Sequence, residues 1–362
     1  MTAPSDRRTA VWPVLSMVAL LAGITAAGIG ALSLTEALTA TGLPDPGPVT
    51  TAGLPFVRAA GEIAAVLAVG SFMFATFFVP PQDNGVLDVA GYRALRMGVA
   101  ASAVWAVCAV LLIPLTVSDV SGQPLRDHLN PVELWSVASL VDTAAAWRWT
   151  AVLALVVAVA GRAVLRWSWM PFLLAGSLIA LVPLGLTGHS SAGGAHDIAT
   201  NSLLIHLLAG ALWAGGLLAL LAHAIRGGDH AGLAARRFSA VAFWCFIAMA
   251  FSGVINALVR MRPSDLFASE YGWLVVAKIV ALCSLGVIGW RQRRGPVAAL
   301  HADPQARGPL VRLAFVEALV FGLTFGVAVG LGRTPPPAPR RDRKSTRLNS
   351  SHIQKSRMPS SA

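Results

Sequence analysis

Long apolar stretches, separated by short polar segments, dominate the chain. A helix needs about 20 apolar residues to cross about 30 Å of hydrocarbon. Nine stretches meet this requirement, at residues 11–33, 57–79, 94–116, 147–166, 168–187, 200–222, 237–258, 272–290 and 310–331. The pattern predicts an all-α fold, a polytopic transmembrane bundle of about nine spans. The very short link between the fourth and fifth spans predicts a tight antiparallel hairpin.

The segment between the third and fourth spans has a different pattern. "NPVELWSVASLVDTAAAW" (130–147) mixes polar and apolar positions and carries Pro131 at a predicted helix start. Proline is favoured in the first turn of a helix, and mixed polarity is typical of helices that lie on a membrane surface. We therefore expect an interfacial helix here. The first span is too long for the apolar region of a signal peptide and should be retained.

Basic residues predict the orientation of the bundle, because cytoplasmic loops of membrane proteins are enriched in Lys and Arg. With a cytoplasmic N-terminus, the outer side up to Leu331 carries only Arg58, Arg126, Arg148, Arg260 and Arg262. The inner side then carries Arg7, Arg8, Arg93, Arg96, Arg162, Arg166, Arg226, Arg236, Arg237, Arg291, Arg293, Arg294, Arg307 and Arg312. This asymmetry predicts a multi-pass protein with its N-terminus in the cytoplasm and a ninth span that exits outward.

Composition supports the membrane class. The chain of 362 residues is 56% hydrophobic and only 12% charged, whereas about a quarter of a soluble domain is charged. The net charge of +11 is explained by the topology, and we expect the lipid bilayer, not nucleic acid, as the partner. The three cysteines form no CxxC pair, so they are interpreted as small core residues.

The sequence divides into four predicted regions. Residues 1–135 form a three-span membrane region with the start of the interfacial helix, and residues 136–333 form a second membrane domain. Residues 334–343 read as a stiff proline-rich linker. Residues 344–362 are polar and without apolar period; they resemble a translated adapter and are interpreted as a non-native tail. The alternative is a genuine disordered tail.

Three histidines surround the start of the sixth span, in "GHSSAGGAHDIATNSLLIHLL" (188–208). His189 and His196 lie in a flexible loop that can fold back over the helix, and His206 lies about 9–12 Å below the outer helix end. Imidazole suits a divalent transition metal, copper above all. We therefore predict a copper site formed by these three residues. The alternatives are a plain outer loop and, for His206, a hydrogen bond to a neighbouring backbone or to Glu62.

Other polar residues in the spans are costly and are functional candidates by default. Helix rise places Glu62, Asn256 and Lys278 in the outer half, near the depth of His206, and Glu317 about 10 Å from the opposite face. We predict that these four support the metal pocket. For Lys278 two roles are open. The structural role is an ion pair with Glu317 or Glu62, and the functional role is ion translocation.

The sixth span carries two further signals. Trp213 shares a face with His206 and is predicted to close the floor of the pocket; packing is the alternative. Two pairs of small residues, each four positions apart, let another helix approach closely. They are Gly210 with Ala214 and Ala211 with Gly215. Met73 and Met249, in the second and seventh spans, have thioethers that can pass Cu(I), although packing is the more common role.

Three segments then resemble a known family. They are "HLLAGALWAGGLLAL" (206–220), "RRFSAVAFWCFIAMAFSGVINALV" (236–259) and "YGWLVVAKIVALCSLGVIGWRQR" (271–293). Together they resemble the membrane domain of the copper resistance protein D (CopD) family. The first five spans resemble the amino-terminal part of its longer actinobacterial members, in which a cytochrome c oxidase assembly domain follows. The membrane domain ends near "RTPPP", close to where that assembly domain would begin. We expect that the assembly domain is missing from this sequence.

The resemblance implies copper handling at the inner membrane, usually uptake, with a periplasmic copper-binding partner in some organisms. The matching segments contain His206, Trp213, Asn256 and Lys278. We therefore predict copper transport or delivery, in the service of copper resistance, by a protein that is not an enzyme. No Ser-His-Asp or GxSxG pattern of a hydrolase appears.

Two alternatives remain. One is a non-transporting subunit for cytochrome oxidase assembly, which metal-uptake assays would distinguish from a transporter. The other is a b-type haem-binding electron carrier, which usually needs facing histidines on two spans. His206 and His223 lie about 25 Å apart on one predicted helix, so haem is not an expected cofactor.

We accordingly predict that the visible spectrum of the purified protein lacks a Soret band. The presence of that band would favour the electron carrier over the copper transporter.

Overall fold

The computed structural model describes residues 11–41, 45–187, 196–302 and 307–332. Within these ranges the protein is all-α, with no β-strand and one isolated bridge between Val86 and Arg166. Nine candidate membrane spans occur in the described residues, which confirms the predicted fold class. They are formed by α2 (Val11–Thr41), α3 (Pro48–Met73) with η1 (Phe74–Phe78), α4 (Val89–Ser121), α6 (Asp142–Ala163), α7 (Met170–Ile179) with α8 (Val182–Leu186), α9 (His196–Ile225), α10 (Ala231–Arg260), α11 (Glu270–Arg294) and α13 (Gly308–Leu331). The linker and tail lie outside the described residues.

Short elements connect the spans. They are η2 (Leu125–His128), α5 (Pro131–Ala138), η3 (Trp167–Trp169), η5 (Pro263–Asp265) and α12 (Pro296–Ala302). Helix α5 begins where the sequence predicts, with the Asn130 side chain accepting a hydrogen bond from the Val132 amide (3.2 Å) and Pro131 in the first turn. Its Trp135 is 64% exposed and is covered by the Arg148 guanidinium, 4.5 Å from the ring centroid. Attachment of α5 to a membrane surface stays a prediction.

Local chemistry sets the ends of several spans. The Asp88 carboxylate accepts from the Gly91 amide (2.6 Å) and begins α4. Gly122 ends the same helix with φ 68°, a left-handed conformation that glycine adopts without steric cost. The fifth span is divided into α7 and α8 just before Pro183, which lacks the amide hydrogen that a continuous helix needs.

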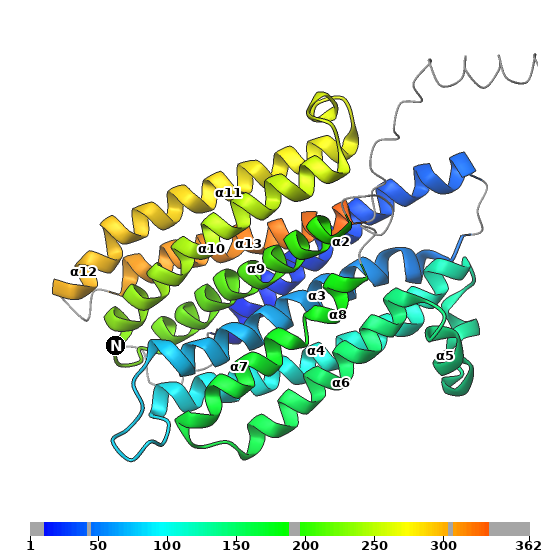
Figure 1. The fold of residues 1–362 in the computed structure, drawn as a ribbon. Helices are drawn as coiled ribbons and strands as arrows, with labels where there is room; N and C mark the ends of the chain where they lie inside the picture. Colours follow the sequence, from blue (N-terminus) through cyan, green and yellow to red (C-terminus); the bar gives the residue numbers. More distant parts are fainter. Residues whose placement is uncertain (1–10, 42–44, 188–195, 303–306, 333–362) are drawn as a thin grey trace, which may run out of the picture.

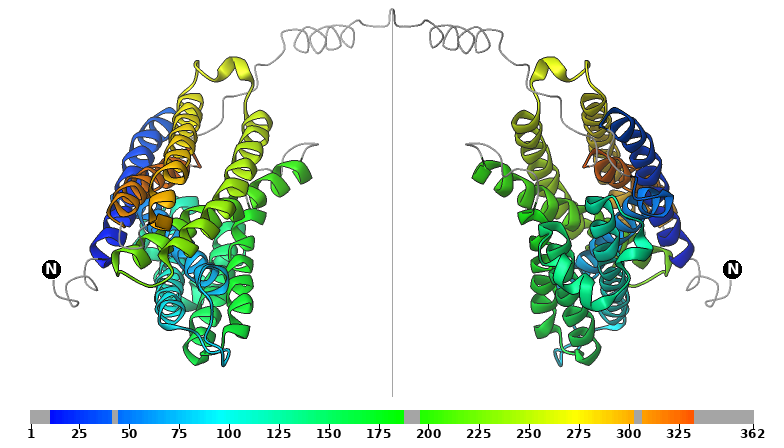
Figure 2. Two further views of the ribbon diagram at one scale, coloured as in Figure 1. Left: turned by 90° about the vertical axis from the view of Figure 1, so that its left-hand side faces the viewer. Right: turned by 90° about the vertical axis from the view of Figure 1, so that its right-hand side faces the viewer.

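The second span, formed by α3 and η1, is the central element of the bundle. In Figures 1 and 2 it runs between α4, α6 and α7 on one side and α2, α9 and α13 on the other. In its most apolar window 89% of the residues are buried, against 22% for α10 and 17% for α11. The last two helices therefore form the periphery, and their exposed apolar side chains face the lipid in a membrane.

Helices α3 and α9 touch through their backbones at Gly70 and Gly215. A Cβ added to Gly70 would lie 1.9 Å from the Gly215 carbonyl carbon, and one added to Gly215 would lie 2.1 Å from the Val66 carbonyl oxygen. No side chain fits at either position. The predicted close approach of a helix at Gly215 is thus confirmed, whereas Gly210 faces the Met249 side chain instead.

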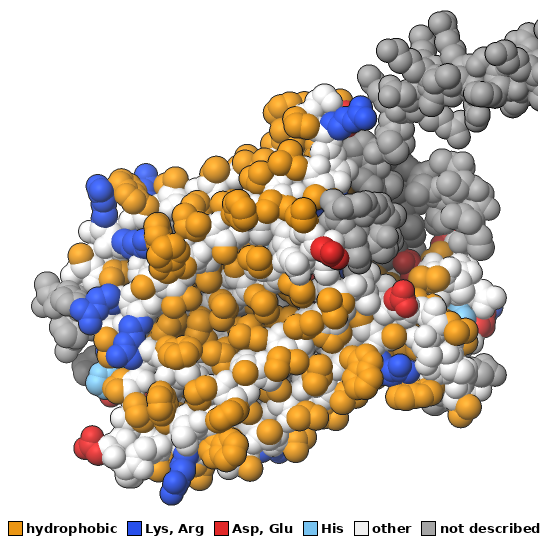
Figure 3. All heavy atoms as spheres, viewed as in Figure 1, with side chains coloured by type: hydrophobic (Ala, Val, Ile, Leu, Met, Phe, Trp, Pro, Cys, Tyr) orange, Lys and Arg blue, Asp and Glu red, His pale blue; other side chains and the backbone are white. Residues whose placement is uncertain are grey.

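Arginines gather at one end of the bundle, as the left-hand side of Figure 3 shows. We call the end at which α9 begins the Asp197 end, and the opposite one the Ile225 end. The described arginines of the predicted inner set lie towards the Ile225 end, because each is beyond a span terminus on that side or within about two turns of one. Which end faces the cytoplasm stays a prediction.

The Gly70–Gly215 contact yields a stability prediction. Gly215→Ala should lower the melting temperature of the protein in detergent, because overpacking costs about 1–3 kcal/mol even when a side chain can move, and here the obstacle is backbone. The control is Gly289→Ala on α11, where an added Cβ meets nothing within 4 Å. Equal melting temperatures for the two variants would contradict the described packing of α3 on α9.

Candidate functional site

His206 lies at the contact between α9 and α10, in the half of the bundle near the Asp197 end. Its Nδ1 is 3.0 Å from the Ser252 hydroxyl oxygen. That hydroxyl donates its own hydrogen to the Ala248 carbonyl oxygen (2.6 Å), so it acts as the acceptor towards the imidazole. The ring also hydrogen-bonds to the Met249 backbone. A neutral ring that donates from Nδ1 carries its lone pair on Nε2, which is the form that a metal ion requires.

Two further polar side chains surround this contact. The Asn256 amide nitrogen donates to the Ser202 hydroxyl (3.2 Å) and to the Ser252 carbonyl oxygen (2.9 Å). The Ser202 hydroxyl also donates to that carbonyl oxygen (3.0 Å). The Asn256 Oδ1 atom is buried and has no hydrogen-bond partner among the described residues. A buried acceptor without a donor is costly, so this oxygen is a candidate to bind a water molecule or a ligand.

Several charged side chains act on the histidine electrostatically. Glu62 of α3 forms an ion pair with Arg58, one turn away (3.1 Å), and Lys278 of α11 acts electrostatically on both Glu62 and His206. Arg260, at the end of α10, acts on His206 and Lys278. Of the two carboxylates considered as partners of Lys278, Glu62 is the one that interacts electrostatically with it, although the described residues form no ion pair between the two side chains.

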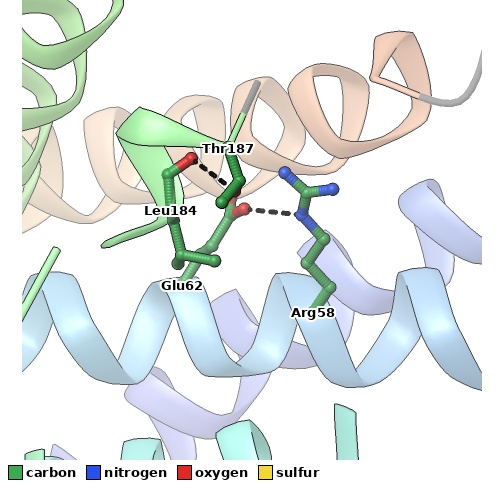
Figure 4. A network of polar contacts seen from close by, with 4 residues as sticks. All are labelled: Arg58, Glu62, Leu184 and Thr187. Carbon is green, nitrogen blue, oxygen red and sulfur yellow. Dashed lines mark hydrogen bonds and ion pairs between the residues drawn. The ribbon is translucent and has the colours of Figure 1, made fainter. Parts of the chain in front are cut away.

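The Arg58–Glu62 pair lies beside the end of α8 (Figure 4), where the Thr187 hydroxyl donates to the Leu184 carbonyl oxygen (3.3 Å). Residue 187 is also the last described residue before the loop that carries His189. His189 and the His196 side chain lie outside the described residues, so the predicted three-histidine site stays a prediction. The described residues contain no cluster of three His, Cys, Asp or Glu side chains suited to a metal ion.

Two sulfur-containing side chains of α10, Met249 and Cys245, lie below the level of His206. The Met249 sulfur packs against α9, 3.5 Å from where a Gly210 side chain would begin. Cys245 is buried one further turn away on the same face of α10. The contact between α9 and α10 therefore presents an imidazole, a thioether and a thiol at successive depths; we call these three residues the seam.

A second polar network lies in the half of the bundle near the Ile225 end. Glu317 of α13 is buried and accepts a hydrogen bond from the Gln292 side chain of α11 (2.6 Å). It also accepts one from the indole of Trp213 on α9. Glu317 is therefore held by two neutral donors and forms no ion pair with Lys278 among the described residues. Trp213 takes part in this network and packs on Phe321 (5.1 Å between ring centroids), below the level of His206.

Sequence reasoning missed Ser252 and Gln292. Serine in a span is common, and its importance depends on facing His206 from another helix. Gln292 follows the predicted end of the eighth span at residue 290, whereas α11 continues to Arg294. A longer predicted span would have identified Gln292 as a polar residue that needs a partner.

The apolar spans pack into a multi-helix bundle with a few polar residues between them. This arrangement defines the protein as a polytopic α-helical membrane protein. The family model described as "Copper resistance protein D" matches residues 232–331, and the one described as "Copper resistance protein D-like, N-terminal domain" matches residues 49–198. The chain belongs to the copper resistance protein D family.

Relatives differ in length. The chain is 27% identical to an uncharacterised protein of Mycobacterium leprae over 53% of this chain and 30% of that protein. An uncharacterised protein of Mycobacterium tuberculosis is 27% identical over 57% of this chain and 31% of its own length. The inner membrane protein YebZ of Escherichia coli is 27% identical over 67% of this chain and 84% of YebZ. The chain thus spans less than a third of the mycobacterial relatives. No solved structure gives a significant match.

The second network yields a test of its structural role. Glu317→Leu should lower the melting temperature in detergent, because Gln292 and Trp213 would lose their acceptor at a cost of about 1–3 kcal/mol. Glu317→Gln keeps an acceptor oxygen and should cost less. A Leu variant as stable as the Gln variant would contradict the described hydrogen bonds.

Proposed function

We propose that this protein moves copper across the membrane, and that His206 is a protein ligand on the path of the ion. The observation that carries the proposal is the seam, in which the His206 imidazole, with Nδ1 on the Ser252 hydroxyl, lies one level above the sulfur atoms of Met249 and Cys245. Family membership supports a relation to copper resistance. A structural role alone would not require ligand atoms of this kind at successive depths.

The chemistry of the seam favours Cu(I) as the transported ion. Thioether and thiol sulfur are soft ligands, which select Cu(I) over harder ions. The charged groups near His206 act in the same direction. Arg260 and Lys278 repel any metal cation, and because Coulomb energy is proportional to charge, the repulsion of Cu(II) is twice that of Cu(I). Glu62 offsets part of this repulsion.

The proposed location is the bacterial inner membrane, in line with the name of YebZ. With the predicted orientation, the Asp197 end faces outward, and His206 meets copper before the sulfur atoms do. Copper then moves inward, as in uptake or delivery, and a periplasmic copper-binding protein is a suitable donor. A role in cytochrome oxidase assembly without transport is the outcome to expect if cells gain no copper through this protein.

A b-type haem is disfavoured by the geometry of α9. His206 and His223 lie on one helix, separated by about 25 Å of helix rise, and cannot bind the two faces of one haem. His223 is moreover committed to a structural contact, with Nε2 2.7 Å from the Asp229 carbonyl oxygen and its ring packed on Phe74, 4.9 Å between centroids.

The proposal predicts that His206→Ala lowers copper accumulation in cells that express the protein, at unchanged protein level. The affinity of the purified protein for Cu(I) should fall at least about tenfold, since changes even beyond the direct ligands cost 10–100-fold. His206→Gln should also lose the affinity, because it can keep a hydrogen bond to Ser252 but lacks the imidazole.

The matched control is His128→Ala, which removes an imidazole from η2 at the same end of the bundle. It should leave copper accumulation and Cu(I) affinity unchanged. Normal accumulation and affinity in His206→Ala, at normal expression, would refute His206 as a copper ligand.

A further inference from the structure

A groove opens on the surface of the bundle near the Ile225 end, between α10, α11 and α12. It encloses about 420 Å³ and is lined by Arg236, Ser239, Phe243 and Trp244 of α10, by Arg293 of α11 and by Val297 of α12. Two arginines therefore face one groove from two different helices. The groove lies away from the seam and from the Glu317 network, and the proposed copper path makes no use of it.

The two arginines differ in how they are held. Arg293 donates to the Ser239 carbonyl oxygen, and its guanidinium lies 5.1 Å from the centroid of the Phe243 ring. Arg236 is exposed and makes no hydrogen bond or ion pair with the described part of the chain. One guanidinium is thus fixed in the groove, while the other is available to an anion. Both repel a cation and neither has a carboxylate partner there.

The depth of the groove matches the boundary of a bilayer. Helix α10 has 30 residues and is about 45 Å long, about 15 Å more than the hydrocarbon thickness. Arg236, five residues after the helix start, then lies near the level of the lipid headgroups. Phe243 and Trp244 follow about two turns deeper and are 44% and 70% exposed, so they face acyl chains.

We propose that this groove binds one anionic phospholipid, with its phosphate between Arg236 and Arg293 and an acyl chain along Phe243 and Trp244. Guanidinium groups recognise phosphate through paired hydrogen bonds, and basic pockets between transmembrane helices bind anionic headgroups. The aromatic rings give a phospholipid an advantage over free phosphate, which has no apolar part to bury.

The test uses the full-length protein in detergent, with added phosphatidylglycerol, phosphatidylcholine or inorganic phosphate, and native mass spectrometry to measure the bound ligand. Wild type should retain phosphatidylglycerol in preference to phosphatidylcholine, and inorganic phosphate should not displace it. Arg236→Gln should lower retention about fivefold, the effect expected of one basic residue near an anionic lipid. The double variant Arg236→Gln with Arg293→Gln should lose more.

Arg291→Gln is the matched control, because it removes the same charge from the same end of α11 outside the groove. It should retain phosphatidylglycerol as wild type does, and Arg236→Lys, which keeps the charge, should retain more than Arg236→Gln. Melting temperatures identify a variant that has merely unfolded, and Arg236 makes no described contact that its loss would break. Equal retention by Arg236→Gln and Arg291→Gln, no preference over phosphatidylcholine, or displacement by inorganic phosphate would overturn the proposal.

Discussion

The backbone contact between Gly70 and Gly215 sets how the two central helices, α3 and α9, pack on each other. With no side chain at either residue, α9 packs directly on α3, and the remaining spans surround this pair (Figure 1). Membrane helices associate through such close packing, because lipid supplies no hydrophobic force between them. As a result one face of α9 is enclosed by protein, and His206 and Trp213 meet partners on other helices instead of lipid.

The sequence predicts the spans well, but it predicts poorly which side chains on different spans contact one another. The reason is physical. Length and hydropathy identify a span without knowledge of its neighbours, and all nine were found to within a few residues at most ends. Which helices touch depends on packing that no single span encodes. Glu317 was therefore considered with Lys278, whereas the fold gives it Gln292 and Trp213. Helix rise placed His206 and Asn256 at a similar depth, because it fixes depth without knowledge of the neighbours, and the hydrogen bonds of Ser252 and Ser202 join their surroundings.

The two polar networks along α9 have different character. Near the Asp197 end, Ser252 orients the imidazole of His206, and the side-chain oxygen of Asn256 is buried with no donor among the described residues. Near the Ile225 end, the Glu317 carboxyl is satisfied by two donors from other helices. The first network has the unused ligand atoms that binding requires, and the second has the closed hydrogen bonds that hold helices together. The proposed copper path therefore uses the first network.

X-ray absorption at the copper edge, on purified protein loaded with Cu(I), tests the proposed seam most directly. The account predicts nitrogen and sulfur neighbours around copper, with the sulfur contribution reduced when Met249 is replaced by Leu and Cys245 by Ser. A copper environment of nitrogen and oxygen alone, or a sulfur contribution that persists in that double variant, would contradict it.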